Sequence, residues 1–371
     1  MPDRSAYAMS SSETSRPVPP APRRPPRGGR IAAIAVGLCL LLAAGWTIAW
    51  QLVSLRVEAT LQAWIEQRRA LGDRIEHGPL AMGGYPLTVT VTMKEVHWTR
   101  ERGPTLLTAA APELVATARV WSPLSLLVQP TRGARASAAG SWGSLTGDAG
   151  RVEAVVALGR RMPERIDLML RDLELTGPGG VRLARIDSVD ASIDPDPEAD
   201  PAAVAGSVPT TLAITAHAAG VRPAGTEELP FNGPAVVAVK AALRGAVDPT
   251  AGLPGLVLWR DAGGVIDVHR LSVSWSPVDL VGDGTFALDA ALRPEGAGVA
   301  EIQGVAETLD RLVAQGRMKP GQAALLKLAA IAASEPSEDG SRQRLKAPVT
   351  VQDGTLRLGQ FPVAKVRSIA D

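Results

Sequence analysis

A long uncharged stretch is the first feature of the hydrophobic pattern of this chain. Residues 31–55 carry no charge, about 25 positions in a row. A helix of that length rises about 37 Å, enough to cross a hydrocarbon core of about 30 Å with some tilt. Trp46 and Trp50 lie toward its far end, and indoles favour the lipid–water interface. The pattern predicts a transmembrane helix over residues 31–55.

After this stretch the apolar positions take a helical spacing, with charges between them. Within residues 56–71 they are Val57, Leu61, Trp64, Ile65 and Leu71. This spacing predicts an amphipathic stalk that continues the membrane helix and ends near Gly72.

The pattern then changes to strict alternation, which is typical of half-buried strands. In residues 87–93 apolar side chains alternate with threonines, and Pro86 marks the start. Val89 and Val91 are therefore expected to face the core. Further strands are predicted over residues 113–120, 144–158, 181–193, 210–218, 236–246 and 285–292.

The alternation slips by one residue at Lys94-Glu95, at Arg171-Asp172 and at His269-Arg270. A slip turns all later side chains to the other face of a sheet, so each place is expected to hold a β-bulge that restores the inward direction. The three segments suggest a repeated architectural unit. The alternative is coincidence, because no other residues repeat at a fixed period.

Turn and helix signals complete the predicted fold. Asp283-Gly284 and Asp353-Gly354 have the chemistry of hairpin turns, and helices are predicted only late, over residues 305–315 and 320–333. The expected class is mainly β (α+β). Large antiparallel twisted sheets with bulged strands follow an N-terminal transmembrane and stalk helix, and two late helices complete the chain.

The segment 194–209, rich in Pro and Asp, is the best internal linker. The expected organisation is a disordered basic cytoplasmic tail (1–30), the transmembrane helix (31–55), the stalk and a first β region (56–193), the linker (194–209), and a second β region with helices near 305–333 (210–371). One large domain and two coupled domains both remain open.

Charge on either side of the uncharged stretch sets the expected topology. The tail before it is rich in arginine and has only Asp3 and Glu13 as acids, whereas the segment after it balances arginines with acids. The positive-inside rule places the N-terminus in the cytoplasm and the body across the membrane. The alternative is a cleaved secretory signal with a site at Ala43-Ala44-Gly45, but apolar regions of signals run only about 7–15 residues.

Composition narrows the function classes. With 39 Lys and Arg against 38 Asp and Glu, the chain has no electrostatic footprint for nucleic acid. Its single cysteine, Cys39, lies in the uncharged stretch, so the body after it can form no disulfide. Aromatic residues make up 4%, which leaves the core to Val, Leu, Ile and Ala and argues against a base-stacking platform.

No motif of catalysis or metal binding is present. His77, His97, His217 and His269 are far apart in sequence, and a structural role on strands is favoured for them. The acidic run Asp194, Asp196, Glu198 and Asp200 has alternate carboxylates, as calcium loops have, but the prolines between them favour a solvated linker. No catalytic, cofactor-binding or metal-binding residue is expected, nor any cofactor, and the chain is not expected to be an enzyme.

Short motifs at both ends of the body carry a family resemblance. They are Gly84-Tyr85-Pro86, Ala111-Pro112, Trp121-Ser122-Pro123, Ala347-Pro348-Val349, Asp353-Gly354 and Leu358-Gly359. With the anchor and stalk before them, they resemble domain of unknown function 2125, a family of membrane-anchored bacterial envelope proteins. The resemblance implies a single-pass inner-membrane protein with a periplasmic domain, and it implies no activity or site residue. A looser likeness to AsmA-like envelope proteins rests on architecture alone.

Two non-enzymatic functions follow. The first is an envelope scaffold or partner-binding module. The alternative is lipid handling, in which a β surface lined with aliphatic residues beside a bilayer binds or transfers acyl chains. The expected partners are the membrane and an envelope protein or lipid, without nucleic acid. A continuous open apolar trough favours lipid, and a closed core with one exposed patch favours a protein partner.

Overall fold

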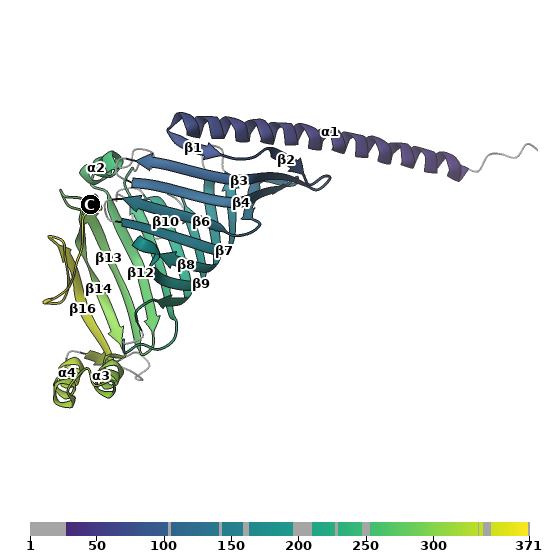
Figure 1. The fold of residues 1–371 in the computed structure, drawn as a ribbon. Helices are drawn as coiled ribbons and strands as arrows, with labels where there is room; N and C mark the ends of the chain where they lie inside the picture. Colours follow the sequence, from purple (N-terminus) through teal and green to yellow (C-terminus); the bar gives the residue numbers. More distant parts are fainter. Residues whose placement is uncertain are drawn as a thin grey trace, which may run out of the picture. The chain divides into compact units, whose positions relative to one another are not determined.

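The computed structural model describes residues 27–102, 105–140, 143–158, 163–195, 210–226, 229–246, 253–332, 334–336 and 343–369. The chain divides into two compact units, Met1–Ala49 and Trp50–Asp371. Helix α1 (Arg27–Ala70) spans the boundary between them, and all the described strands lie in the second unit (Figure 1).

Helix α1 contains both helical segments that the sequence predicts. It runs from the uncharged stretch through the stalk, which confirms that one continues into the other. From Ile34 onward it is long and apolar enough to cross a membrane, a property that a signal sequence shares. It ends before Gly72, which takes a left-handed φ of 91° and donates its N–H to the carbonyl of Arg69 at 3.0 Å.

The described residues form eighteen strands in one sheet. The first half of the sheet comprises β1 (Asp73–Glu76), β2 (Leu80–Gly83), β3 (Thr88–Arg102), β4 (Thr105–Arg119), β5 (Ser122–Pro130), β6 (Ala134–Gly140), β7 (Gly143–Leu158), β8 (Pro163–Thr176) and β9 (Arg182–Asp194), with the short 3-10 helix η1 (Pro178–Gly180). The second half comprises β10 (Thr210–Pro223), β11 (Ala235–Arg244), β12 (Val265–Trp275), β13 (Val278–Leu288), β14 (Pro294–Gln303), β15 (Ser334–Pro336), β16 (Gln343–Gln352), β17 (Thr355–Leu358) and β18 (Phe361–Lys365). The other helices are α2 (Leu253–Asp261), α3 (Val305–Ala314) and α4 (Pro320–Ala332).

The strands follow one another as an antiparallel meander. Each strand from β7 to β13 pairs with the next along the chain, β14 pairs with β16, and β5 and β6 share one row between β4 and β7. In Figure 1, β3 and β4 run across the direction of β13 and β14, so the sheet is strongly twisted. The predicted class, mainly β with antiparallel bulged strands and late helices, is confirmed.

The two predicted β regions share this sheet, because β9 pairs with β10. Asp194 is the last residue of β9, and residues 196–209 of the expected linker lie outside the described residues. The predicted boundaries of the two regions stay a prediction.

All three predicted bulge positions interrupt the regular strand, but the irregularity is of two kinds. At His269 the register of β12 shifts against both neighbours, which confirms a bulge. At Glu95 and Asp172 the strand instead takes a left-handed φ of 52°. The register is the same on both sides of each, because the partner strand is interrupted at the same level.

These interruptions form a line across neighbouring strands. Asp172 lies opposite Gly150 of β7, where an added Cβ would be 3.2 Å from the Asp172 Cβ. On the other side a Cβ on Gly220 of β10 would lie 2.2 Å from Asp187 Oδ2 of β9. Gly133, between β5 and β6, approaches the carbonyl of Ala149 in the same way. At this level each strand therefore changes which of its alternate residues point to a given face of the sheet, and neighbouring strands change together.

One predicted turn is wrong. Asp283-Gly284 lies inside β13, and the strand predicted over 285–292 is only the end of β13, which stops at Leu288. Gly284 is opposite Gly298 of β14, and a Cβ on Gly284 would lie 2.8 Å from the Gly298 Cα, so glycine here permits close strands rather than a turn. The turn at Asp353-Gly354 is confirmed, with φ of 50° and 67° between β16 and β17.

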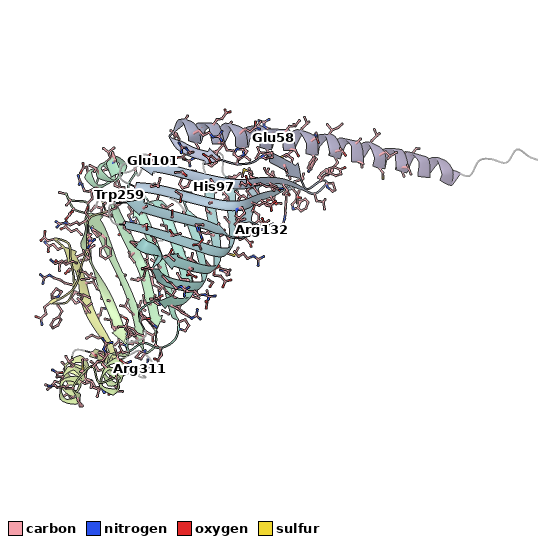
Figure 2. The ribbon with its side chains drawn as sticks, viewed as in Figure 1. Glu58, His97, Glu101, Arg132, Trp259 and Arg311 are labelled. Atoms are coloured by element: carbon pink, nitrogen blue, oxygen red, sulfur yellow. The ribbon has the colours of Figure 1, made fainter. Side chains whose placement is uncertain are left out.

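Sequence reasoning also missed α2, whose nine residues include the largest fully buried side chain of the described residues. Trp259 is 1% exposed and packs with Leu288 and Leu292. Its indole Nε1 donates to the carbonyl of Arg244 at 2.7 Å. Trp259 therefore closes one end of the sheet (Figure 2). A second group of buried residues lies by the stalk and comprises Ile65, Ile75, Val89, Val91 and Met93.

The left-handed residue on β3 predicts an unusual response to glycine. Glu95→Gly should raise the free energy of unfolding by up to about 1 kcal/mol, since an L residue costs about 1–2 kcal/mol in this region and glycine does not. Lys94→Gly, one residue earlier, should lower it by about 0.5–1 kcal/mol, because glycine weakens an ordinary strand. Urea unfolding of both variants measures the difference, and equal destabilisation would contradict the assigned backbone of Glu95.

Candidate functional site

One face of the sheet is apolar along its whole course. Residues directly opposite each other in antiparallel strands point to the same face, so the register can be followed from strand to strand. One such row runs through Val91, Ala116, Val128, Ala154, Leu168, Ala191, Ala216, Val239, Leu271, Gly282, Ala300 and Ala347. Each member is aliphatic or glycine, and we call this face the apolar trough.

The row beside it has the same character. It contains Met93, Leu114 and Pro130 in β3–β5, and Leu170 and Val189 in β8 and β9. In the first row Val91 and Ala300 are buried and the other members are half-buried. A sheet face covered by a second layer is normally buried, so the trough is only partly covered.

Three hollows lie along the trough. One of about 400 Å³ spans β3 to β8 and is lined by strand residues such as Val96, Leu114 and Leu168. Another of about 380 Å³ spans β12 to β18 and includes Leu271 and Val351. In the described residues, neither has a lining residue from a helix.

The third hollow, of about 500 Å³, lies between the stalk and the first strands. Val57, Leu61 and Trp64 of α1 face Val89 and Val91 of β3. The expectation that Val89 and Val91 are buried is confirmed, with exposures of 3% and 4%. The stalk thus covers one end of the trough, and the trough continues beyond it.

The line of interruptions keeps the trough continuous. On β8, Leu168 and Leu170 precede Asp172 and Leu173 follows it, yet all three leucines line the same hollow. Without the irregular residue, the regular alternation would turn Leu173 to the opposite face.

The opposite face of the sheet is polar and holds ion pairs between neighbouring strands. Arg171 of β8 pairs with Asp190 of β9 at 2.8 Å, and Arg344 of β16 pairs with Glu301 of β14 at 3.1 Å. These side chains are partly exposed, so the pairs are worth little individually. They mark this face as the one in contact with water.

The polar face has a hollow of its own, of about 400 Å³, near the line of interruptions. Glu95, His97, Arg132, Arg135 and Asp148 line it, and Figure 2 labels His97 and Arg132. Arg135 and Asp148 form an ion pair at 2.5 Å. The side chains of Glu95, His97 and Arg132 are exposed, so this hollow does not exclude water from its charged groups.

The structure does not bring the four histidines together. His97 and His217 are exposed on β3 and β10, His77 Nδ1 lies 2.7 Å from the carbonyl of Gly78, and His269 is half-buried at the β12 bulge. Within the described ranges no group of three or more His, Cys, Asp or Glu side chains is placed to hold a metal. Of the acidic run considered for calcium, only Asp194 belongs to the described residues.

A largely enclosed ion pair joins Arg244 of β11 to Asp267 of β12, with side chains 6% and 21% exposed. The hydroxyl of Thr285 donates to Asp267 Oδ1 at 2.7 Å. Burial raises the pKa of the Asp267 carboxyl, but the hydrogen bonds from Arg244 and Thr285 and the charge of Arg244 outweigh burial, so its pKa lies below the ordinary 3.8.

Comparison with known proteins gives one match. The model of a family described as "Uncharacterized protein conserved in bacteria (DUF2125)" matches residues 50–367. No curated protein and no solved structure matches the chain. The match includes the stalk, the trough and both late helices.

The pKa of Asp267 predicts a pH dependence of stability. Because the folded value lies below the unfolded one, this carboxylate stabilises the fold above about pH 4, and its contribution is lost as pH falls through the folded pKa. Asp267→Asn should lower the free energy of unfolding at pH 7 by about 1–3 kcal/mol and flatten the acid dependence. Asp283→Asn, at an exposed position of β13, should change it by less than about 0.5 kcal/mol. Urea unfolding from pH 7 to pH 3 measures both, and an unchanged acid dependence in Asp267→Asn would contradict the assignment.

Proposed function

We propose that this chain, which belongs to the DUF2125 family, is a non-enzymatic envelope protein that holds lipid acyl chains in its apolar trough. The observation that carries the proposal is the row of aliphatic residues from β3 to β16, half-buried along most of its length. Ligand sites for apolar molecules are lined in this way, with few polar groups.

The dimensions of the trough suit acyl chains. Neighbouring strands lie about 4.8 Å apart, so eleven steps along the row cover roughly 50 Å of curved surface. The hydrocarbon core of a whole bilayer is about 30 Å thick. A protein partner would normally need some polar contacts, and the hollow across β3–β8 has Arg135 as its one charged lining residue among the described residues.

A scaffold or partner-binding role is the second candidate, and one observation favours it. Helix α4 exposes Leu325 and Leu328 by 70% and 64%. Exposed apolar patches of this kind mark interaction sites. This patch is separate from the trough, so an envelope partner and a lipid are compatible.

We also propose that α1 anchors the protein in the bacterial inner membrane, with the N-terminus in the cytoplasm and the body in the periplasm. The arginine-rich tail and the uncharged stretch support this orientation. A periplasm-dependent reporter fused after Asp371 should be active, and the fusion should stay at full length in washed membranes. Activity of a cytoplasm-dependent reporter alone would contradict the topology, and a shortened soluble fusion would identify a cleaved signal.

The lipid proposal predicts that bound acyl chains touch one face of β8 and not the other. A photoreactive amino acid at Leu170, between Val152 and Val189, should crosslink to phospholipid in cells. The same group at Met169, one residue earlier and between Glu153 and Asp190 on the polar face, should not. Mass spectrometry of the purified full-length adducts measures both. The pairing controls for lipid bound along α1, which is equally present in the two proteins.

Lysine substitutions at the same two positions test the trough by charge. Leu170→Lys should reduce lipid crosslinking from a photoreactive group at Leu271, because an ammonium in the trough disfavours acyl chains. Met169→Lys, which gains two acidic neighbours, should leave it unchanged. Absence of lipid adducts at both Leu170 and Leu271 in a folded protein would overturn the proposal and leave the partner-binding role.

A further inference from the structure

Two turns at one end of the sheet, with the start of β5, expose large apolar side chains that lie close together. The β2–β3 turn exposes Tyr85 by 52% and Leu87 by 56%, the turn joining β4 to β5 exposes Trp121 by 63%, and the start of β5 exposes Leu124 by 62%. The turns are neighbours, because the N–H of Val120 donates to the carbonyl of Leu87 at 3.2 Å. We call these four residues the apolar rim.

The rim lies against the last part of the uncharged stretch of α1. Trp50 Nε1 donates to the carbonyl of Thr88 at 2.8 Å, and its ring meets the ring of Tyr85 edge to face at 5.5 Å. Trp50 is five residues before Leu55, where the uncharged stretch ends, and Leu52 and Leu55 are 63% and 55% exposed. The rim and the end of this stretch therefore lie side by side.

We infer that the apolar rim inserts into the lipid–water interface of the membrane that α1 anchors. Tyrosine and tryptophan are the residues that favour this interface, because each has an apolar body and a polar tip. The leucines beside them add apolar area and have no polar side-chain group to desolvate. The membrane is the one partner whose position is fixed by the chain itself, since Trp50 belongs both to the uncharged stretch and to the contacts of the rim.

The rim also borders the trough. The hollow under the stalk is lined by Pro123 of β5, between the rim residues Trp121 and Leu124, by Leu158 at the end of β7 and by Arg56, the first charged residue of the stalk. An inserted rim would open this hollow to the bilayer. The inference rests on the proposed anchorage by α1, and it does not require that lipid fill the trough.

A depth measurement tests the insertion. In the full-length chain with Cys39→Ser, a single cysteine at Leu124 is labelled with an environment-sensitive fluorophore, and the protein is reconstituted in vesicles of phosphatidylcholine and phosphatidylglycerol. Lipids brominated on the acyl chains should quench the label at Leu124. The matched control is Leu325→Cys on α4, a leucine 70% exposed and far along the chain, which should show little quenching.

Each outcome decides a different point. Strong quenching at Leu124 with little at Leu325 supports insertion. Equal and weak quenching at both sites, in protein that floats with the vesicles, overturns it and leaves the anchorage intact. Protein that does not float with the vesicles overturns the anchorage and the insertion together. Lipid crosslinking at Leu170 is measured separately, so a failure of the trough and a failure of the rim are distinguishable.

Discussion

The period of two along a strand is the constraint on which this structure depends. Every side chain of an extended strand points to the face opposite its neighbours, so one irregular residue inverts everything after it. Here the irregular residues Glu95 and Asp172 are matched by interruptions at the same level in the adjacent strands. Because the inversion occurs in step, strands of about fifteen residues bend without mixing their polar and apolar faces.

An apolar face that is only partly covered needs a physical reason to persist. Each exposed Å² of apolar surface costs about 25 cal/mol relative to burial, so a long trough in water is unfavourable. A second layer, as in a sandwich, would remove the cost. Among the described elements the stalk covers only the end near Val89 and Val91, and Trp259 closes an end near Leu288. An apolar ligand along the rest of the trough would supply the missing layer.

The sequence predicted the secondary-structure elements better than it predicted which segments pack over the sheet. Alternation in residues 87–93, the slips at Glu95 and Asp172 and the late helices were readable, because each depends on local periodicity. Asp283-Gly284 was read as a turn, since the same dipeptide suits both a hairpin and two closely spaced strands. Helix α2 was missed because it is short and carries Pro254 and Gly255 near its start.

The apolar face of the candidate site could be predicted from the sequence, but its exposure could not. Aliphatic residues at alternate positions describe equally well a strand facing a second layer and a strand facing a ligand. The distinction lies in contacts far apart in sequence, such as the absence of helix residues from the hollow around Leu168 in the described structure. The rim was less readable still, because Tyr85 and Trp121 are 36 positions apart and look like ordinary turn residues.

The place of the stalk links the rim to the trough. Leu61 and Trp64 lie over Val89 and Val91, while Leu114 and Ala116, neighbours on one face of β4, line the hollow across β3–β8 and the hollow under the stalk respectively. The two hollows therefore adjoin on this face of β4. An acyl chain entering from the bilayer beside Pro123 would pass under the stalk before it reached β8. Under the proposed function, the packing of the stalk would control access to the trough, and one continuous helix would link the proposed anchor to it.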